Sequence, residues 1–175
     1  MFSLAPAAVS ADDDQPGVHA VAFAAAMTNQ SEVPATPGSG RGIASFVLSG
    51  DGTLLYFSVS VTDLSSPASA AHIHLGSPGA NGDVIVNLCG AGSTPACAND
   101  GLVASGTIDD SSLAGPMAGR TLDDLLAALE SNATYVNVHS ERFPNGEIRG
   151  QVQSLDANDS SESLAENTLA RDDTR

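Results

Sequence analysis

The chain has 175 residues with no Trp, two Tyr and five Phe, so it suits one domain with terminal extensions and a mainly aliphatic core. Its formal net charge is -15, and all six basic residues are arginines scattered along the chain. No basic patch can form, which argues against nucleic acid or an anionic membrane surface as a partner. No apolar run of about 18 residues is present, so no membrane span is expected.

Residues 1–17 are predicted to be a signal remnant or a flexible acidic leader. The opening "MFSLAPAAVSA" has small residues at Val9 and Ala11, as before a secretory cleavage site, and Asp12–Asp14 follow. The basic start and the full apolar stretch of a secretory signal are missing. We therefore expect a truncated signal and an exported protein, secreted or at the cell surface.

Residues 18–153 are predicted to form one β domain. In "TLLYFSVSVTD", apolar residues at every second position predict a half-buried strand. "GIASFVLS" before it alternates in the same way, and Asp51–Gly52 between the two predicts a hairpin. Further strands are expected at 18–27, 70–76, 83–88, 101–109, 134–139 and 146–152.

Cys89 and Cys97 bracket the short loop "GAGSTPA". Without a CxxC pattern, a zinc or redox site at these cysteines is poorly supported. A local disulfide in an exported domain fits better.

One helix and one tail complete the chain. In "TLDDLLAALESN", leucines at i, i+3, i+4 and i+7 predict a helix for which Thr121 is the N-cap. Residues 154–175 are acidic without alternation and are predicted to form a flexible tail. About eight strands with one short helix favour an all-β, antiparallel sandwich or barrel.

Two histidines lie two residues apart in "AAHIHLG", residues 70–76. In a strand His72 and His74 share one face, while Ile73 points to the other. Their Cα atoms are then roughly 6.5–7 Å apart, so both imidazoles can reach one ion.

The same split between apolar and polar faces recurs in two later strands. In "TYVNVHS", Asn137 and His139 oppose the valines. In "GEIRGQV", Glu147 and Arg149 oppose Ile148. Because the apolar residues must face the core, we expect the histidines to share the opposite, wetter face.

These observations lead to a metal-site hypothesis. If the strands are neighbours, His72, His74 and His139 form a three-imidazole site for copper or zinc, whereas calcium or magnesium would require oxygen ligands. Neighbouring residues expected to support the ligands are Asn137, Glu147 and Arg149. The alternative is that the histidines only form hydrogen bonds with neighbouring strands or with Glu147.

Two stretches, "AAHIHLGSPGANGDVIVNL" and "YVNVHSERFPNGEIRGQV", resemble the CHRD family, the domain first described in chordin. The resemblance covers roughly residues 18–153. It implies an extracellular Greek-key, immunoglobulin-like β-sandwich that acts as a binding or structural module, without a settled enzymatic activity. Its expected functional surface is the histidine-bearing polar face, and its expected partners are other extracellular or cell-surface proteins.

The HIH motif also resembles the copper-binding HVH stretch of Cu,Zn superoxide dismutases. The Asp-and-His zinc loop of those enzymes has no counterpart here, which argues against dismutase activity. Two alternatives to the binding module therefore stay open. One is a copper- or zinc-binding protein, with superoxide-dismutase-like redox chemistry at His72, His74 and His139. The other is an adhesion or matrix component whose sheet edges or acidic surface contact other chains.

Overall fold

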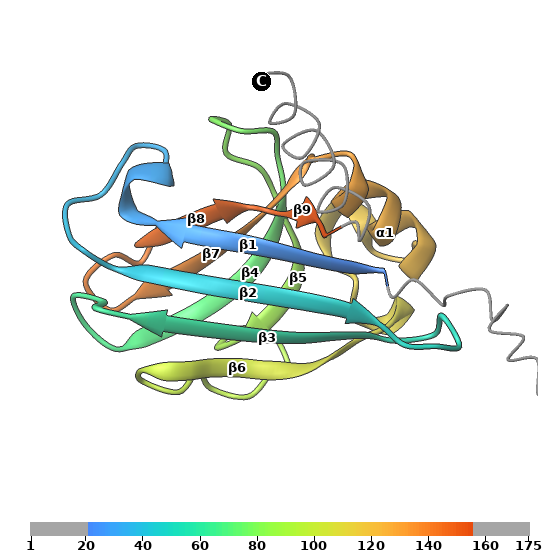
Figure 1. Cartoon of the computed structure of the whole chain (residues 1–175). Coiled ribbons are helices and arrows are strands. Elements are labelled where there is room, and N and C mark those ends of the chain that lie inside the picture. The colour runs from blue at the N-terminus through green and yellow to red at the C-terminus, as the bar shows by residue number, and fades with distance from the viewer. Residues whose placement is uncertain (1–20, 156–175) are drawn as a thin grey trace, which may run out of the picture.

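The computed structural model describes residues 21–155 as a curled antiparallel sheet with a short helix at one end (Figure 1). The expected leader and nearly all of the expected tail lie outside the described residues. The strands are β1 (Ala22–Thr28), β2 (Arg41–Leu48), β3 (Leu55–Thr62), β4 (Ala68–Leu75), β5 (Val84–Cys89), β6 (Gly101–Ile108), β7 (Thr134–Ser140), β8 (Ile148–Gln151) and β9 (Gln153–Ser154).

Hydrogen bonds join the strands in the order β5-β4-β7-β8-β1-β2-β3-β6, and β9 pairs with β1. The sheet curls so that β5 and β6, at the two ends of this path, approach each other. The prediction of an all-β antiparallel fold with one helix is confirmed. The finer assignment as a Greek-key sandwich stays a prediction.

The core lies inside this curl, and alternation along the strands builds it. Phe46 of β2 pairs with Phe57 of β3, and Ala44 pairs with Val59. Phe46, Val59 and Ile73 are fully buried. The inward faces read from the sequence are therefore the core faces in the structure.

Strand ends and short helices differ from the sequence-based prediction. A short strand, β9, pairs with the start of β1 where the tail was expected to begin. Three 3-10 helices were not predicted, because three residues are too few to show a period. They are η1 (Asn29–Ser31), η2 (Asp110–Ser112) and η3 (Gly115–Met117).

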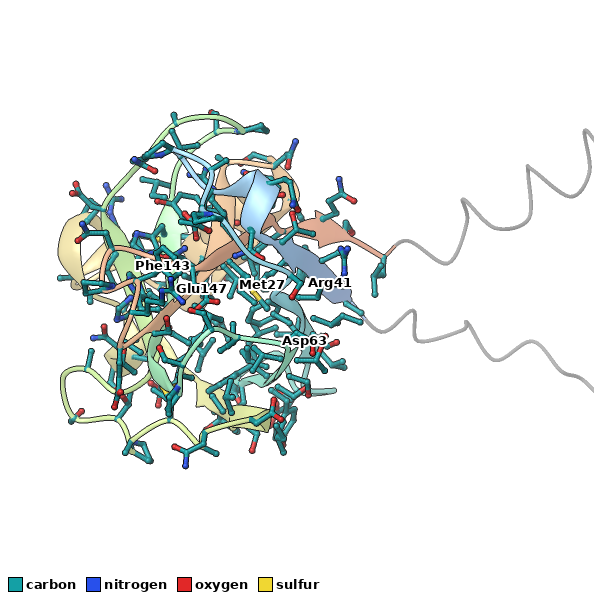
Figure 2. The ribbon with its side chains drawn as sticks, turned by 90° about the vertical axis from the view of Figure 1, so that its left-hand side faces the viewer. Met27, Arg41, Asp63, Phe143 and Glu147 are labelled. Atoms are coloured by element: carbon teal, nitrogen blue, oxygen red, sulfur yellow. A yellow bond between two sulfur atoms is a disulfide. The ribbon has the colours of Figure 1, made fainter. Side chains whose placement is uncertain are left out.

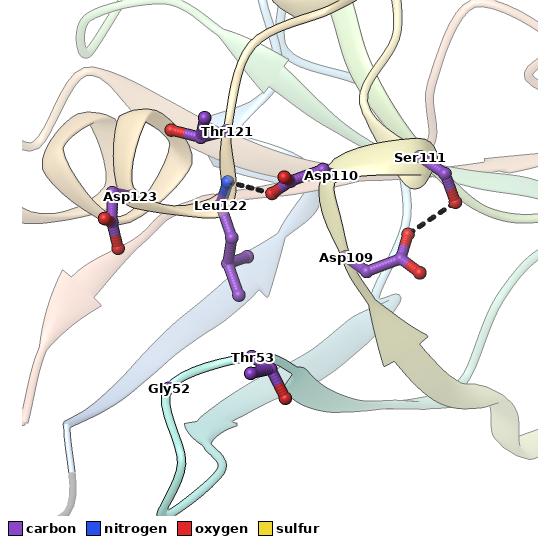
Figure 3. Close-up of a pocket in the computed structure, with 8 residues that line it drawn as sticks. All are labelled: Gly52, Thr53, Asp109, Asp110, Ser111, Thr121, Leu122 and Asp123. Atoms are coloured by element: carbon purple, nitrogen blue, oxygen red, sulfur yellow. Dashed lines mark hydrogen bonds between the residues drawn. The ribbon is translucent and has the colours of Figure 1, made fainter.

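The helix α1 (Leu122–Glu130) begins where Thr121 predicts it. The Thr121 hydroxyl accepts from Asp124 N–H, and the Asp124 carboxylate accepts from Thr121 N–H, which forms a capping box. Asp110 Oδ1 also accepts from Leu122 N–H at 2.6 Å (Figure 3). The acidic pocket in Figure 3 therefore contains carboxylates that already cap the chain's own backbone.

Cys89 and Cys97 form a disulfide with a Cα–Cα distance of 5.0 Å. This confirms the predicted pair. In the part of the chain that the structure describes, no helix has the length and apolarity needed to cross a membrane.

Candidate metal centre

The sheet brings the three predicted histidines together. His72 and His74 lie on β4, and His139 lies on the neighbouring β7, where its cross-strand partner is Ala70. His139 therefore lies diagonally across from His72, on the same face of the sheet. One ring nitrogen from each histidine lies within 4.8 Å of the other two.

Backbone carbonyls fix the protonation of two of the rings. His74 Nδ1 lies 2.9 Å from Gly82 O, and His139 Nδ1 lies 2.9 Å from Pro144 O. A carbonyl only accepts, so in each ring Nδ1 carries the hydrogen and Nε2 carries the lone pair. Hydrogen bonds of this kind orient histidine ligands in metal sites.

The remaining nitrogens face one another. His72 Nδ1 lies 3.0 Å from His139 Nε2 and donates to its lone pair. His74 Nε2 is buried and has no hydrogen-bond partner among the described residues. The preformed ligand atoms are therefore Nε2 of His74 and Nε2 of His139. Nδ1 of His72 completes the set when its hydrogen moves to Nε2 of the His72 ring.

Burial keeps these imidazoles neutral. Burial and, to a lesser extent, the nearby His139 and His74 rings together lower the pKa of His72 to about 4. Burial is also the main cause that lowers the pKa of His74 and of His139. At neutral pH all three rings therefore have the form that binds metal.

The expectation that this face is the wetter one is wrong. His72 and His74 are each only 9% exposed, and Glu147 is fully buried. The loops 29–40 and 76–83 cover the face, and Asn81 joins them by donating from Nδ2 to Val33 O at 2.8 Å.

Arg149, one of the predicted supporting residues, secures the second of these loops. Its guanidinium donates to Asn81 Oδ1 and to two carbonyls of the 76–83 loop, the shortest at 2.7 Å. The guanidinium carbon lies 3.4 Å from the ring centroid of Tyr135. The Tyr135 ring in turn stacks on His74 with a centroid distance of 4.7 Å.

Asn137 and Glu147 have other partners than the histidines. Asn137 donates to the Glu32 carboxylate and to Ile148 O. Glu147 Oε1 accepts from Ser65 N–H at 2.7 Å, while Oε2 is buried without a partner among the described residues. Within the described chain, no hydrogen bond joins these two side chains or Arg149 to an imidazole.

Sequence reasoning missed three contributors to this site. Tyr135 lies beside His74 on the neighbouring strand, and its hydroxyl also accepts from Gly82 N–H. At Gly82 a Cβ would lie 1.6 Å from Leu75 O, so only glycine fits there. Glu32 is 8% exposed, and burial raises its pKa to about 7 although Arg149 and Asn137 lower it. Both Glu32 and Gly82 lie in loops, which show no periodic signal.

Comparison with known proteins gives one family. The family model described as CHRD domain matches residues 23–152, most of the chain and both histidine strands. No curated protein and no solved structure gives a significant match.

Proposed function

This chain belongs to the CHRD family, and we propose that it is an extracytoplasmic binding module whose functional centre is a three-histidine site for copper or zinc. The observation that carries the proposal is the convergence of three ring nitrogens within 4.8 Å on one face. Two of the rings are held by carbonyls in the tautomer that ligation needs.

The donor set determines the class of metal. Three imidazole nitrogens suit copper or zinc, and calcium or magnesium would need oxygen ligands. A fourth position is left for water or for a group from a partner. In this proposal Arg149 and Tyr135 support His74 from outside the ligand set.

One observation supports the proposed location. A disulfide such as Cys89–Cys97 persists in oxidising compartments, which fits secretion or a cell-surface position. In the proposed assignment, the curled sheet is an immunoglobulin-like Greek-key sandwich, and its partners are other extracellular or cell-surface proteins.

A second candidate is a copper-dependent redox protein of the superoxide dismutase type. The observation in its favour is the same donor set. All three candidate ligands are imidazole nitrogens, and Cys89 and Cys97 are bound to each other in a disulfide. Superoxide consumption by the copper-loaded protein, measured against the metal-free protein, separates this candidate from a binding module.

Titration of untagged protein with Cu²⁺ or Zn²⁺ tests the site. We expect one ion per chain. We expect His74→Gln to weaken metal binding by more than about 100-fold, which is more than the loss of a residue that only orients a ligand causes. His19→Gln is the matched control, because it removes the remaining histidine and leaves the three proposed ligands.

The folded state of each variant is checked by circular dichroism, since His74 is buried. A Cu²⁺ electron paramagnetic resonance spectrum should show nitrogen hyperfine coupling that changes in His139→Gln and not in His19→Gln. Equal affinity in the wild type and in folded His74→Gln and His139→Gln proteins would contradict the site.

A further inference from the structure

Exposed apolar side chains gather on the outer face of β1, β2, β3 and β6, far from the histidines in the sheet order. Ile43 is 60% exposed, Leu102 is 55% exposed, and Tyr56 and Val47 are also exposed. Of the seven large apolar residues that the described chain exposes, these four lie on this face, and the other three are Val21, Leu75 and Leu155. Large exposed apolar side chains that gather on one face often mark a site of interaction.

The strand register arranges these side chains in two rows across the four strands. One row contains Ala22, Val47, Tyr56 and Thr107. The other contains Ala26, Ile43, Ser60 and Leu102. The rows lie four residues apart along β2, which is roughly 13 Å.

Small side chains fill the space between the two rows. The row midway between them contains Ala24, Ser45, Ser58 and Ser105. The face thus has two apolar ridges with a shallow trough between them. A hollow of about 340 Å³ also lies beside Ile43, lined by residues of β1, β2 and β3.

The face is almost free of charge in a chain whose net charge is -15. Its four strands contain one charged residue, Arg41, at the start of β2 (Figure 2). Acidic residues of the described chain lie instead in turns, in loops and on α1. Two copies of the chain can therefore approach here without opposing their carboxylates, whereas most other surfaces bring like charges together.

We propose that this face is the docking surface for a second copy of the same chain, in a two-fold symmetric dimer. A two-fold interface uses the same patch on both copies, so the patch must complement itself. A ridge of one copy fits the trough of the other, and the two sheets pack face to face about 10 Å apart. The proposal does not depend on metal binding at the histidines.

The size of the face determines the expected affinity of the dimer. Four strands about 4.8 Å apart and eight residues long give a face of roughly 19 by 27 Å, at the low end for a specific interface. We therefore expect a reversible dimer that forms at high protein concentration. Salt should strengthen it, because screening weakens the repulsion between the acidic chains.

Sedimentation equilibrium of the full chain, with a chelator present, tests the proposal over a range of protein and salt concentrations. We expect a monomer–dimer equilibrium that shifts toward dimer as NaCl is raised. Ile43→Glu should lower the association constant by at least about 100-fold, because it places a carboxylate in one of the two rows that form each copy's patch. The matched control is Leu75→Glu, an exposed apolar position on β4 outside the face, which should leave the association constant unchanged.

Leu102→Glu provides a second disruptive variant on a different strand, and circular dichroism verifies the fold of each protein. A wild type that stays monomeric at the highest concentration and salt overturns the proposal, including the case in which the face binds another protein instead. A dimer that survives both Ile43→Glu and Leu102→Glu, or that Leu75→Glu also disrupts, overturns it as well.

Discussion

Replacing Arg149 with methionine is expected to lower the free energy of unfolding by about 3–5 kcal/mol, because several partly buried acceptors each lose a charged donor. Arg149 is 2% exposed and donates to Asn81 Oδ1 and to two carbonyls of the 76–83 loop. Methionine fills much of the same volume but leaves those acceptors without their donor. The contact between the guanidinium and the Tyr135 ring is lost as well.

The same substitution is expected to weaken metal binding by about 10–100-fold, the usual effect of losing a group that orients a ligand. The loop that Arg149 holds supplies the Gly82 carbonyl to which His74 Nδ1 donates. Once that loop loosens, the His74 ring is free to turn and to exchange its tautomer. Arg149 therefore acts on the site through the loop and Tyr135, without contacting the ion.

Urea denaturation and Cu²⁺ or Zn²⁺ titration of folded Arg149→Met protein measure the two effects. Arg142→Met is the matched control, because the Arg142 side chain is exposed and its guanidinium carbon lies 5.8 Å from the Phe143 ring centroid. Its effect on stability should stay within about 0.5 kcal/mol, as for an ordinary surface position. A similar loss of stability in the two variants, or an unchanged metal affinity in Arg149→Met, would contradict the role given to the 76–83 loop.

The strands and the shared face of the histidines could be predicted because both follow from local alternation. A period of two fixes which residues point the same way, so His72 and His74 had to lie together once the segment formed a strand. The proximity of His139 required β7 to lie beside β4, which alternation alone does not give. In the sequence that pairing was a condition of the site, and the register of the structure supplies it.

The burial of the histidine face could not be predicted from the same alternation. A polar face was interpreted as a solvent-facing one, yet Asn137 and Arg149 are almost fully buried. Their partners are mostly groups on the 29–40 and 76–83 loops, which have no periodic pattern and reach this face from distant parts of the chain. Long-range hydrogen bonds of this kind leave no signal in a single strand.

This burial changes what is expected of histidine substitutions. On an exposed face, exchange of His74 for alanine would have left folding nearly intact. Because His74 is buried and stacked on Tyr135, the same exchange leaves a cavity and an unsatisfied Gly82 carbonyl. Glutamine, which retains polar atoms and much of the volume, is therefore the better test of ligation.

Replacing Glu32 with glutamine is expected to stabilise the protein above pH 7 and to have little effect near pH 4.5. Burial raises the pKa of Glu32 from its ordinary 4.5 to about 7 in the folded protein. Between these values the native state holds a proton that the unfolded state has lost, so the free energy of unfolding falls as pH rises. Glutamine is uncharged at every pH and keeps an oxygen to accept from Asn137.

The expected gain at pH 8 is about 1–3 kcal/mol, less than the full pKa difference would give, because solvent screens part of the charge. Urea unfolding of both proteins at pH 5 and pH 8 measures it.

The histidines affect stability with the opposite sign, and the comparison must separate the two effects. Burial lowers the pKa values of His72, His74 and His139, so below about pH 6.5 the unfolded state takes up protons that the native state does not. Stability of both proteins therefore falls as pH drops from 6.5 toward 4. Because the wild type and Glu32→Gln share this effect, the difference between their unfolding free energies isolates Glu32. If that difference is the same at pH 5 and pH 8, or if glutamine destabilises the protein at pH 8, then Arg149 outweighs burial and Glu32 is ionised in the folded state.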